Sequence, residues 1–599
     1  MPSSYSAPQS APQPPRPTPG SRQSPTPPPS AAFLGTLTRW ARRPFWEAPD
    51  ASWVVRRWPT LAGVLSATAF FWFSLTPSLL PRPWYFQGLI GGITAATGYA
   101  LGAVAGRLLR PVVARRFSDR ARVRCWQVYY PAALVVSTAA VSWSAHAQRR
   151  LRTLQGLEPS LVWHTPMIML IAIVVCTLLV LVARSVRLLA RTLIRWCARW
   201  VPQPVAYTAG LLATTLLVVV FSKNVLYERG FIGAVDRISR TVNLSMADHE
   251  RPPDSAALSG SPRSLVRWKE LGAEGRKFIS ETPTRQDIAA FTGRPAEEPV
   301  RVYVGEAVGP EDFRAAADIA VRELERTGAF DRRVIALVGT TGSGWVDRWV
   351  VEPLEYMYGG DTAIAAVQYS YLPSWISFLV DKEKAARASR ALYEAVHAKW
   401  ATLPADSRPK LVVSGESLGA YAVEASFGNL DDLLAGTDGA LLVGPPHASP
   451  IRREIAAGRD EGSPVWRPEY DRGRHVRVAQ FPREDLARPT GPWDRPRVVY
   501  LQNASDPVVW WTPDLLFSRP AWLRDPLGPD VTDEIDWVPL ATFWQVTVDL
   551  AVSFDAPPPH GHRYGTNAVE GWAAVVPPQG WTDADTARLK KAQDARRGG

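Results

Sequence analysis

A serine set between two glycines, where a short apolar run gives way to a helical pattern, constrains this chain more than any other feature. Residues 411–413 have the length and composition of a buried strand, and residues 421–427 have helical spacing. Between them, residues 415–419 read Gly-Glu-Ser-Leu-Gly. So sharp a strand-to-helix turn strains the serine backbone and leaves no room for side chains at its flanks. The pattern is typical of a nucleophilic serine, here Ser417.

A nucleophilic serine of this kind requires an acid that follows it in the chain. The apolar run 498–501 has strand length and leads directly into Asp506, on a turn closed by a proline. Asp494 and Asp514 lie nearby and are alternatives. We expect Asp506 to be the acid because it stands at the end of a strand.

The base of such a triad is a histidine near the end of the domain. Residues 546–552 read as another buried strand, and the loop after them carries His560 and His562. A His-x-His pair can also bind zinc, but no cysteine or acidic cluster stands beside it in the sequence. We expect His562 to be the base because Gly561 gives the loop freedom to turn it inward, and His560 remains an alternative.

A serine nucleophile also needs donors for the oxyanion of its intermediate. One is the backbone N–H of the residue after the serine, Leu418. The second is expected from the glycine-rich loop 339–345, which follows the apolar run 334–338, and Thr340 or Thr341 fits that place. A nucleotide site is the competing interpretation of this loop, but no Gly-Lys-Ser/Thr ends it.

Apolar runs of strand length alternate with helical patterns through the second half of the chain, which predicts an α/β fold with a mostly parallel sheet covered by helices on both faces. The expected strands are 300–304, 334–338, 363–369, 411–414, 440–443 and 498–501, and the expected helices include 313–326, 346–358, 382–400 and 418–427.

Charge divides the chain into two unlike halves. Residues 1–240 hold 27 Lys and Arg against 6 Asp and Glu, whereas the rest holds 41 against 50. The basic residues of the first half punctuate apolar segments and form no continuous patch, so the net charge of +12 predicts no binding of nucleic acid.

Five apolar segments of the first half are long enough to cross a bilayer, which takes about 20 helical residues. They are 61–80, 86–105, 128–147, 161–183 and 205–221. Five such segments in succession predict an all-α, multi-span transmembrane domain, with the lipid bilayer as its partner.

The arginines between these segments predict their orientation. Five stand at positions 39–57, ahead of the first span, seven lie between the second and third spans, and five between the fourth and fifth. The loop between the first and second spans has only Arg82, and the loop between the third and fourth has three. Positive charge is enriched in cytoplasmic loops, so the N-terminus is expected inside and everything after residue 221 on the extracytoplasmic side. The three cysteines all lie in the first half, so an outward domain would carry no thiol.

These observations predict five regions along the chain. They are a Pro-rich, disordered cytoplasmic tail with a basic juxtamembrane segment (1–58), the transmembrane domain (59–225), a linker and preamble (226–298), a catalytic domain (299–580) and a C-terminal tail (581–599).

The motifs at 339–345, 415–419, 505–507 and 560–564, taken in order, resemble a family of actinobacterial membrane-anchored α/β-hydrolases, in which a multi-span domain precedes the hydrolase domain. The resemblance covers everything except the N-terminal tail. It implies the α/β-hydrolase fold and a triad of Ser417, Asp506 and a histidine, but no settled substrate. The chain departs from the expected pattern at Pro559, where a glycine or an acid before the first histidine is more usual.

The sequence thus predicts a membrane-anchored serine hydrolase of the esterase or lipase type that acts on a hydrophobic or envelope-lipid ester through an acyl-enzyme, with no cofactor and no metal. An acyltransferase would share the first half-reaction and is an alternative. A catalytically silent outward-facing binding module of a membrane transporter is another, but the expected spans hold no intramembrane acid. The sequence names no protein partner.

Overall fold

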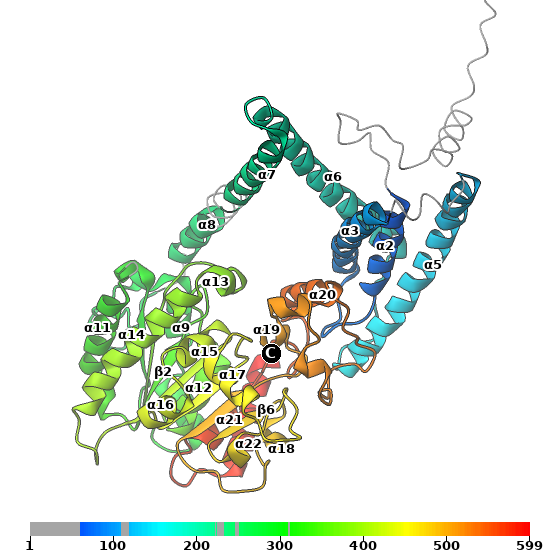
Figure 1. The fold of residues 1–599 in the computed structure, drawn as a ribbon. Helices are drawn as coiled ribbons and strands as arrows, with labels where there is room; N and C mark the ends of the chain where they lie inside the picture. Colours follow the sequence, from blue (N-terminus) through cyan, green and yellow to red (C-terminus); the bar gives the residue numbers. More distant parts are fainter. Residues whose placement is uncertain are drawn as a thin grey trace, which may run out of the picture.

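A computed structural model describes residues 60–109, 119–221, 223, 233–245, 251–309 and 312–598; the predicted tail 1–58 lies outside them. The first half is a set of helices that lies beside the sheet-containing half, with α20 (Ala541–Asp549) of the second half against α3 (Figure 1). Helices α6 and α7 meet far from the sheet, and α8 returns the chain to it. The helices are α2 (Leu61–Phe73), α3 (Trp84–Leu108), α5 (Asp119–Leu154), α6 (Thr165–Cys197), α7 (Gln203–Val220) and α8 (Gly233–Leu244).

Each predicted span overlaps one of the helices α2, α3, α5, α6 and α7, but among the described residues only α3, α6 and α7 are long and apolar enough to cross a membrane. Helix α2 ends at Phe73 after 13 residues, so the predicted span 61–80 is too long at its C-terminal end. Helix α5 extends over 36 residues but does not meet the same criterion. Three of the five predicted spans thus coincide with helices of spanning length and composition in the described part of the chain.

Glycines bring α3 close to two neighbouring helices. A β-carbon on Gly88 or Gly92 would lie 2.8 or 2.5 Å from side chains of α6. A β-carbon on Gly98 or Gly102 would lie 2.6 or 2.4 Å from carbonyl oxygens of α2. Such contacts exclude larger residues, and glycines four positions apart are typical of helices packed in a membrane.

The second half is built around a seven-stranded sheet in which every pair of neighbouring strands is parallel. The strand order β1-β3-β2-β4-β5-β7-β6 puts β4, the strand before Ser417, at the centre. Almost every strand residue is buried, as expected for a parallel sheet covered on both faces. The strands are β1 (Val300–Val304), β2 (Val334–Gly339), β3 (Thr362–Val367), β4 (Lys410–Glu416), β5 (Gly439–Val443), β6 (Val476–Ala479) and β7 (Arg497–Leu501).

Two connected groups of helices pack on this sheet: α11, α14 and α15 form one, and α12, α21 and α22 the other. Helix α11 illustrates why they form, because Asp312 caps its first turn by accepting from the Ala315 N–H at 3.1 Å and its apolar residues recur at helical spacing. The helices are α9 (Gly272–Ser280), α10 (Arg285–Thr292), α11 (Phe313–Arg326), α12 (Arg348–Met357), α13 (Ser374–Val380), α14 (Lys382–Ala401), α15 (Leu418–Glu424), α16 (Leu430–Gly436), α17 (Pro450–Ala457), α18 (Pro482–Asp485), α19 (Pro507–Trp510), α20 (Ala541–Asp549), α21 (Ala568–Val575) and α22 (Asp583–Gly598).

The predicted α/β class, with its parallel sheet, is confirmed, and all six predicted strands are present. Two elements differ from expectation. The run 546–552 is not a strand: it lies in helix α20 and the short 3-10 helix η9 (Leu550–Val552) that follows. Strand β6 was not predicted, because its apolar run is short and interrupted by Arg477.

The segments predicted as a preamble and as a C-terminal tail pack against the sheet domain. Leu258, Trp268, Phe278 and Ile288 belong to the main hydrophobic core. Residues 583–598 form α22, where Lys590 pairs with Glu570 of α21 at 2.7 Å. Both segments are therefore structural parts of this domain.

The loop between α2 and α3 fastens the helical half to the sheet domain. Asp549, at the end of α20, accepts from Ser78 Oγ at 2.9 Å and from the Leu79 N–H at 3.2 Å. Gln155 donates to the carbonyls of both Leu79 and Asp530, at 2.8 and 3.1 Å. Leu79 and its neighbour are buried in a hydrophobic cluster with residues of the sheet domain.

Helix α8 makes a second attachment. Its Asn243 accepts from the Ala273 N–H of α9 at 3.2 Å, and Arg276 donates to the Ser245 carbonyl just after α8. The sheet domain is thus held at two places.

Candidate active site

Strand β4 ends at Glu416 and helix α15 begins at Leu418, so Ser417 alone makes the turn between them. Its φ of 55° and ψ of −123° lie in a region that residues with a side chain rarely adopt. Its N–H donates to the carbonyl of Val443, at the end of β5, at 2.8 Å. The backbone strain expected from the motif is present, and the side chain of Ser417 is partly exposed.

Three glycines allow this turn to form. Gly339 and Gly415 are register partners at the ends of β2 and β4, and α15 crosses them at Gly419. A β-carbon on Gly415 would lie 2.4 Å from the Gly419 carbonyl carbon, and one on Gly419 would lie 2.2 Å from the Gly339 carbonyl oxygen. Any side chain at these positions would push the helix away from the sheet.

The predicted acid and the preferred histidine are in direct contact. His562 Nδ1 lies 2.6 Å from Asp506 Oδ2, and the two side chains are 1% and 0% exposed. Asp506 caps α19, and its Oδ1 accepts from the Val508 N–H at 2.8 Å. Because a carboxylate only accepts, Nδ1 carries the proton of the neutral ring and Nε2 is left as a base.

The ring of His562 lies against the end of strand β5, where the Val443 carbonyl accepts from the backbone N–H of Ser417. Gly444 directly follows Val443, and a β-carbon on Gly444 would lie 2.7 Å from His562 Cε1. His562 Nε2 is buried and has no hydrogen-bond partner among the described residues, so Ser417 Oγ does not bond it here. Such bonds are often long in enzymes without substrate.

His560 belongs to a different cluster. Its Nδ1 lies 2.9 Å from Asp530 Oδ2. The same oxygen accepts from Ser505 Oγ, which in turn accepts from the Gly561 N–H at 2.9 Å. The structure therefore brings His562, and not His560, to Asp506.

The glycine-rich loop after β2 lies beside the turn at Ser417. Thr340 Oγ1 donates to the Val367 carbonyl at 3.0 Å, which fixes the start of the loop. The N–H of Thr341 donates to the Trp345 carbonyl at 3.0 Å. Of the two predicted threonines, Thr340 is thus the better candidate for the second donor, because the N–H of Thr341 is already bonded.

Two residues that the sequence did not single out complete the surroundings. Tyr564 donates to Asp506 Oδ2 at 2.6 Å, and the ring of Phe554 meets that of His562 edge to face at 5.3 Å. A tyrosine two residues after the histidine is the only signal the sequence offers for the first, and none marks the second.

Glu416, inside the motif, is buried next to Asp347. Burial raises the pKa of the Glu416 carboxyl well above its usual range, and the charge of Asp347 acts in the same direction. The raised pKa favours the neutral form of Glu416, which does not compete with Asp506 for positive charge on the imidazole.

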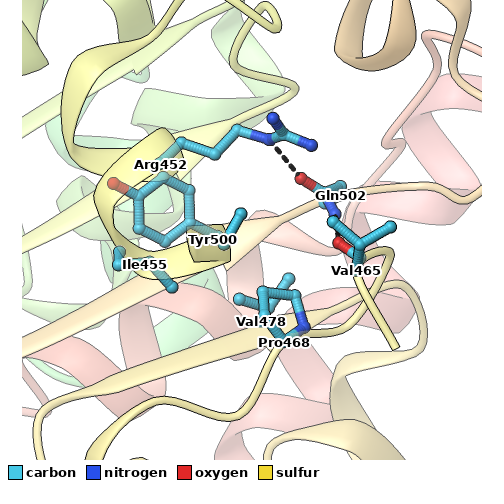
Figure 2. A pocket seen from close by; sticks show the side chains of 8 residues that line it. Arg452, Ile455, Val465, Pro468, Val478, Tyr500 and Gln502 are labelled. Carbon is cyan, nitrogen blue, oxygen red and sulfur yellow. Dashed lines mark hydrogen bonds between the residues drawn. The ribbon is translucent and has the colours of Figure 1, made fainter. Parts of the chain in front are cut away.

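A polar network lies around a void of about 10 Å³ that none of the predicted site residues lines. The Arg452 side chain reaches toward Gln502, to which its Nε donates at 2.6 Å (Figure 2). Its backbone N–H donates to Glu424 at 2.9 Å. The void holds at most about one water, so it is too small for a substrate.

No group of three or more His, Cys, Asp or Glu side chains in the described part of the chain is arranged to hold a metal ion. The alternative of a zinc site at His560 and His562 therefore has no further ligands in that part of the chain.

A sequence model described as the alpha/beta-hydrolase family matches residues 300–589. A second, described as the N-terminus of an alpha/beta-hydrolase family, matches residues 75–283. The first covers the sheet with Ser417, Asp506 and His562, and the second covers most of the helical half. No curated protein matched the chain. No solved structure matched it.

Proposed function

The chain belongs to the alpha/beta-hydrolase family, and from that premise we propose that it is a membrane-anchored serine hydrolase of the esterase type. The observation that carries the proposal is the buried pair of His562 and Asp506. The Nε2 atom of His562 has no hydrogen-bond partner among the described residues. The end of strand β5 contacts both the His562 ring, at Gly444, and the strained backbone of Ser417, at Val443. A buried nitrogen without a hydrogen-bond partner costs free energy, and a role as catalytic base explains why it is kept.

In the proposed mechanism, Ser417 Oγ attacks the ester carbonyl while His562 Nε2 takes the serine proton. Asp506 holds the imidazole in the correct tautomer and stabilises the imidazolium that forms. The N–H groups of Leu418 and Thr340 donate to the oxyanion. The histidine then gives its proton to the leaving alcohol, and a water molecule, activated by the same nitrogen, hydrolyses the acyl-enzyme.

We propose a hydrophobic ester as substrate, of the kind found in envelope lipids. Three helices of spanning length and composition, together with the two attachments of the sheet domain, support a site held close to a bilayer. A water-soluble ester would gain nothing from this arrangement.

We also propose that the chain crosses the membrane several times, with the hydrolase domain outside. The alternation of arginine-rich and arginine-poor loops between the five predicted segments supports this orientation, which requires α2 and α5 to cross the bilayer together with α3, α6 and α7. An alkaline phosphatase fused after Gly599 should be active, and a cytosolic reporter at the same place inactive. The opposite pair of results would reverse the orientation and leave the chemistry untouched.

The chemistry is tested by labelling membranes with a fluorophosphonate probe. The wild type should be labelled, and Ser417→Ala should not, because the probe reacts only with an activated serine. Ser426→Ala is a matched control: it removes a hydroxyl just beyond the same helix that donates only to the Ala422 carbonyl. Labelling that persists in Ser417→Ala would remove the proposed nucleophile, and no labelling of the wild type would favour a silent binding domain.

A further inference from the structure

A cavity of about 340 Å³ lies where the helical half meets the sheet domain. One wall comes from the loop and first residues of α3, a second from the loop between α5 and α6, and a third from the chain just after α20. Its lining includes Arg82, Trp84, Arg152, Val162, Val552 and Asp555. It has the volume of a small-molecule site.

Arg82 is the most unusual side chain in this wall. It is 1% exposed, and its Nη2 donates to the Thr76 carbonyl at 3.0 Å. Its Nε and Nη1 are buried and have no hydrogen-bond partner among the described residues. Asp549 is the acid that acts on it electrostatically, but its oxygens already accept from Ser78 and Leu79. Burial lowers the pKa of the Arg82 guanidinium, and the charge of Asp549 opposes that effect.

The remaining charges of the lining favour an anion. Arg152 is half-buried, and its Nε donates to the Glu158 carbonyl at 2.8 Å. Asp555 is the one acid among the lining residues and is exposed. Two guanidinium groups in one cavity suit a phosphate, because their planar donor sets match its oxygens.

The cavity lies at the ends of the helices that have spanning composition. Trp84 is the first residue of α3, and its ring meets those of Tyr85 and His164 at 5.7 and 5.3 Å. His164 directly precedes α6, and Tyr85 is 48% exposed. Tryptophan and tyrosine gather at the level of lipid headgroups. A headgroup can therefore enter the cavity while its acyl chains stay beside α3 and α6.

We propose that this cavity binds the phosphate of an anionic membrane lipid through Arg82 and Arg152. The chain segment 552–555 forms part of the cavity wall, because Val552 and Asp555 line the cavity. The same segment supports the candidate base, because the Ser553 carbonyl accepts from the backbone N–H of His562 at 2.7 Å. The bound lipid thus touches the segment that positions the imidazole. The binding itself does not depend on the proposed hydrolase function.

The test measures lipid retention and not activity. The full-length protein, purified in a nonionic detergent, is mixed with phosphatidylglycerol or phosphatidylcholine, and bound lipid is counted by native mass spectrometry. Phosphatidylglycerol should be retained preferentially. Arg152→Gln should weaken its retention about tenfold, because one charge-assisted contact is lost. Ser160→Trp, which fills the rim without changing charge, should weaken it as well.

Arg149→Gln is the matched control, because Arg149 is an exposed arginine of the same helix that does not line the cavity. The proposal would be overturned if Arg152→Gln and Ser160→Trp retained as much phosphatidylglycerol as the control Arg149→Gln. It would also be overturned if the wild type retained the two lipids equally. Displacement of the lipid by millimolar inorganic phosphate would overturn the lipid assignment in favour of a soluble phosphate. Arg82→Gln is left as a secondary variant, since loss of this buried side chain threatens folding.

Discussion

Tyr564 and His562 contact the same oxygen of Asp506, each at 2.6 Å. The three side chains are buried, so the carboxylate exchanges its hydration for these two bonds and the bond from the Val508 N–H. An acid with its lone pairs occupied in this way has little freedom to turn away from the imidazole. Tyr564 is thus a positioning residue of the proposed triad.

Replacing Tyr564 by phenylalanine should slow labelling by a fluorophosphonate about tenfold, because a hydrogen bond to a charged group contributes roughly 1.5 kcal/mol. The rate constant of labelling measures the effect. Tyr393→Phe is the control, since its hydroxyl donates at 3.1 Å to a carbonyl, that of Gly436. Equal rates in the two variants would mean that Tyr564 does not position the acid.

The two histidines of the 560–562 loop should differ sharply. His562→Gln should reduce the rate of ester hydrolysis by at least about a thousandfold, because the base is lost. His560→Gln removes a contact to Asp530 and should leave most of the activity. Assays of 4-nitrophenyl esters with both purified variants make the comparison, and the reverse order of effects would exchange the roles of the two residues.

The glycine before the nucleophile should not accept even a methyl group. Gly415→Ala would put a β-carbon 2.4 Å from the backbone of Gly419, and the resulting overpacking should cost about 1 to 3 kcal/mol or more. A lower melting temperature and lost probe labelling are expected together. Gly491→Ala meets its nearest neighbour at 3.9 Å and should change stability by less than about 0.5 kcal/mol.

Glu424 predicts a pH dependence of stability. Burial raises the pKa of its carboxyl from 4.5 to about 7, against the lowering effect of bonds from Arg452 and other groups. The folded state therefore holds this proton more tightly than the unfolded chain. The resulting stabilisation is complete below about pH 4.5 and is lost as the pH rises through 7, by roughly 3 kcal/mol in all.

Glu424→Gln lacks this titration. Its melting temperature relative to the wild type should therefore rise between about pH 5 and about pH 8. Thermal melts of both proteins in the same detergent measure the difference, and two curves that stay parallel across this range would contradict the predicted pKa.

The sheet could be predicted because its strands are short apolar runs that are buried on both faces and alternate with longer helical patterns. Strand β6 was not predicted because Arg477 interrupts its apolar run. Burial of this arginine is possible because its Nη1 donates to the Leu486 carbonyl oxygen at 2.6 Å, a contact that only the fold creates. The run 546–552 has the composition of a strand, yet Gln545 and Asp549, spaced four apart, bond the α2–α3 loop from one face of a helix.

In the site, too, sequence motifs predict some of the contacts and only the fold shows the others. The pairing of Asp506 with a histidine could be predicted from motifs, whereas the preference for His562 over His560 had only the freedom of Gly561 behind it. The choice between the two depends on Asp530, 30 residues before His560 in the chain and with no motif around it. The first predicted span extends past the end of α2. Residues 74–80 are apolar enough to resemble part of a span, but their polar groups bond Asp549 and Gln545 of the sheet domain.

The two attachments of the sheet domain, at the α2–α3 loop and at α8, bear on how the proposed enzyme meets its substrate. A domain on a single flexible tether can move through a volume of solution. A domain attached at two places keeps a constant height and tilt relative to the helices, so it meets substrate molecules only as they diffuse in the plane of the membrane. Its turnover then follows the number of ester molecules per unit area of the leaflet it faces, and dilution of the surrounding medium leaves the rate unchanged.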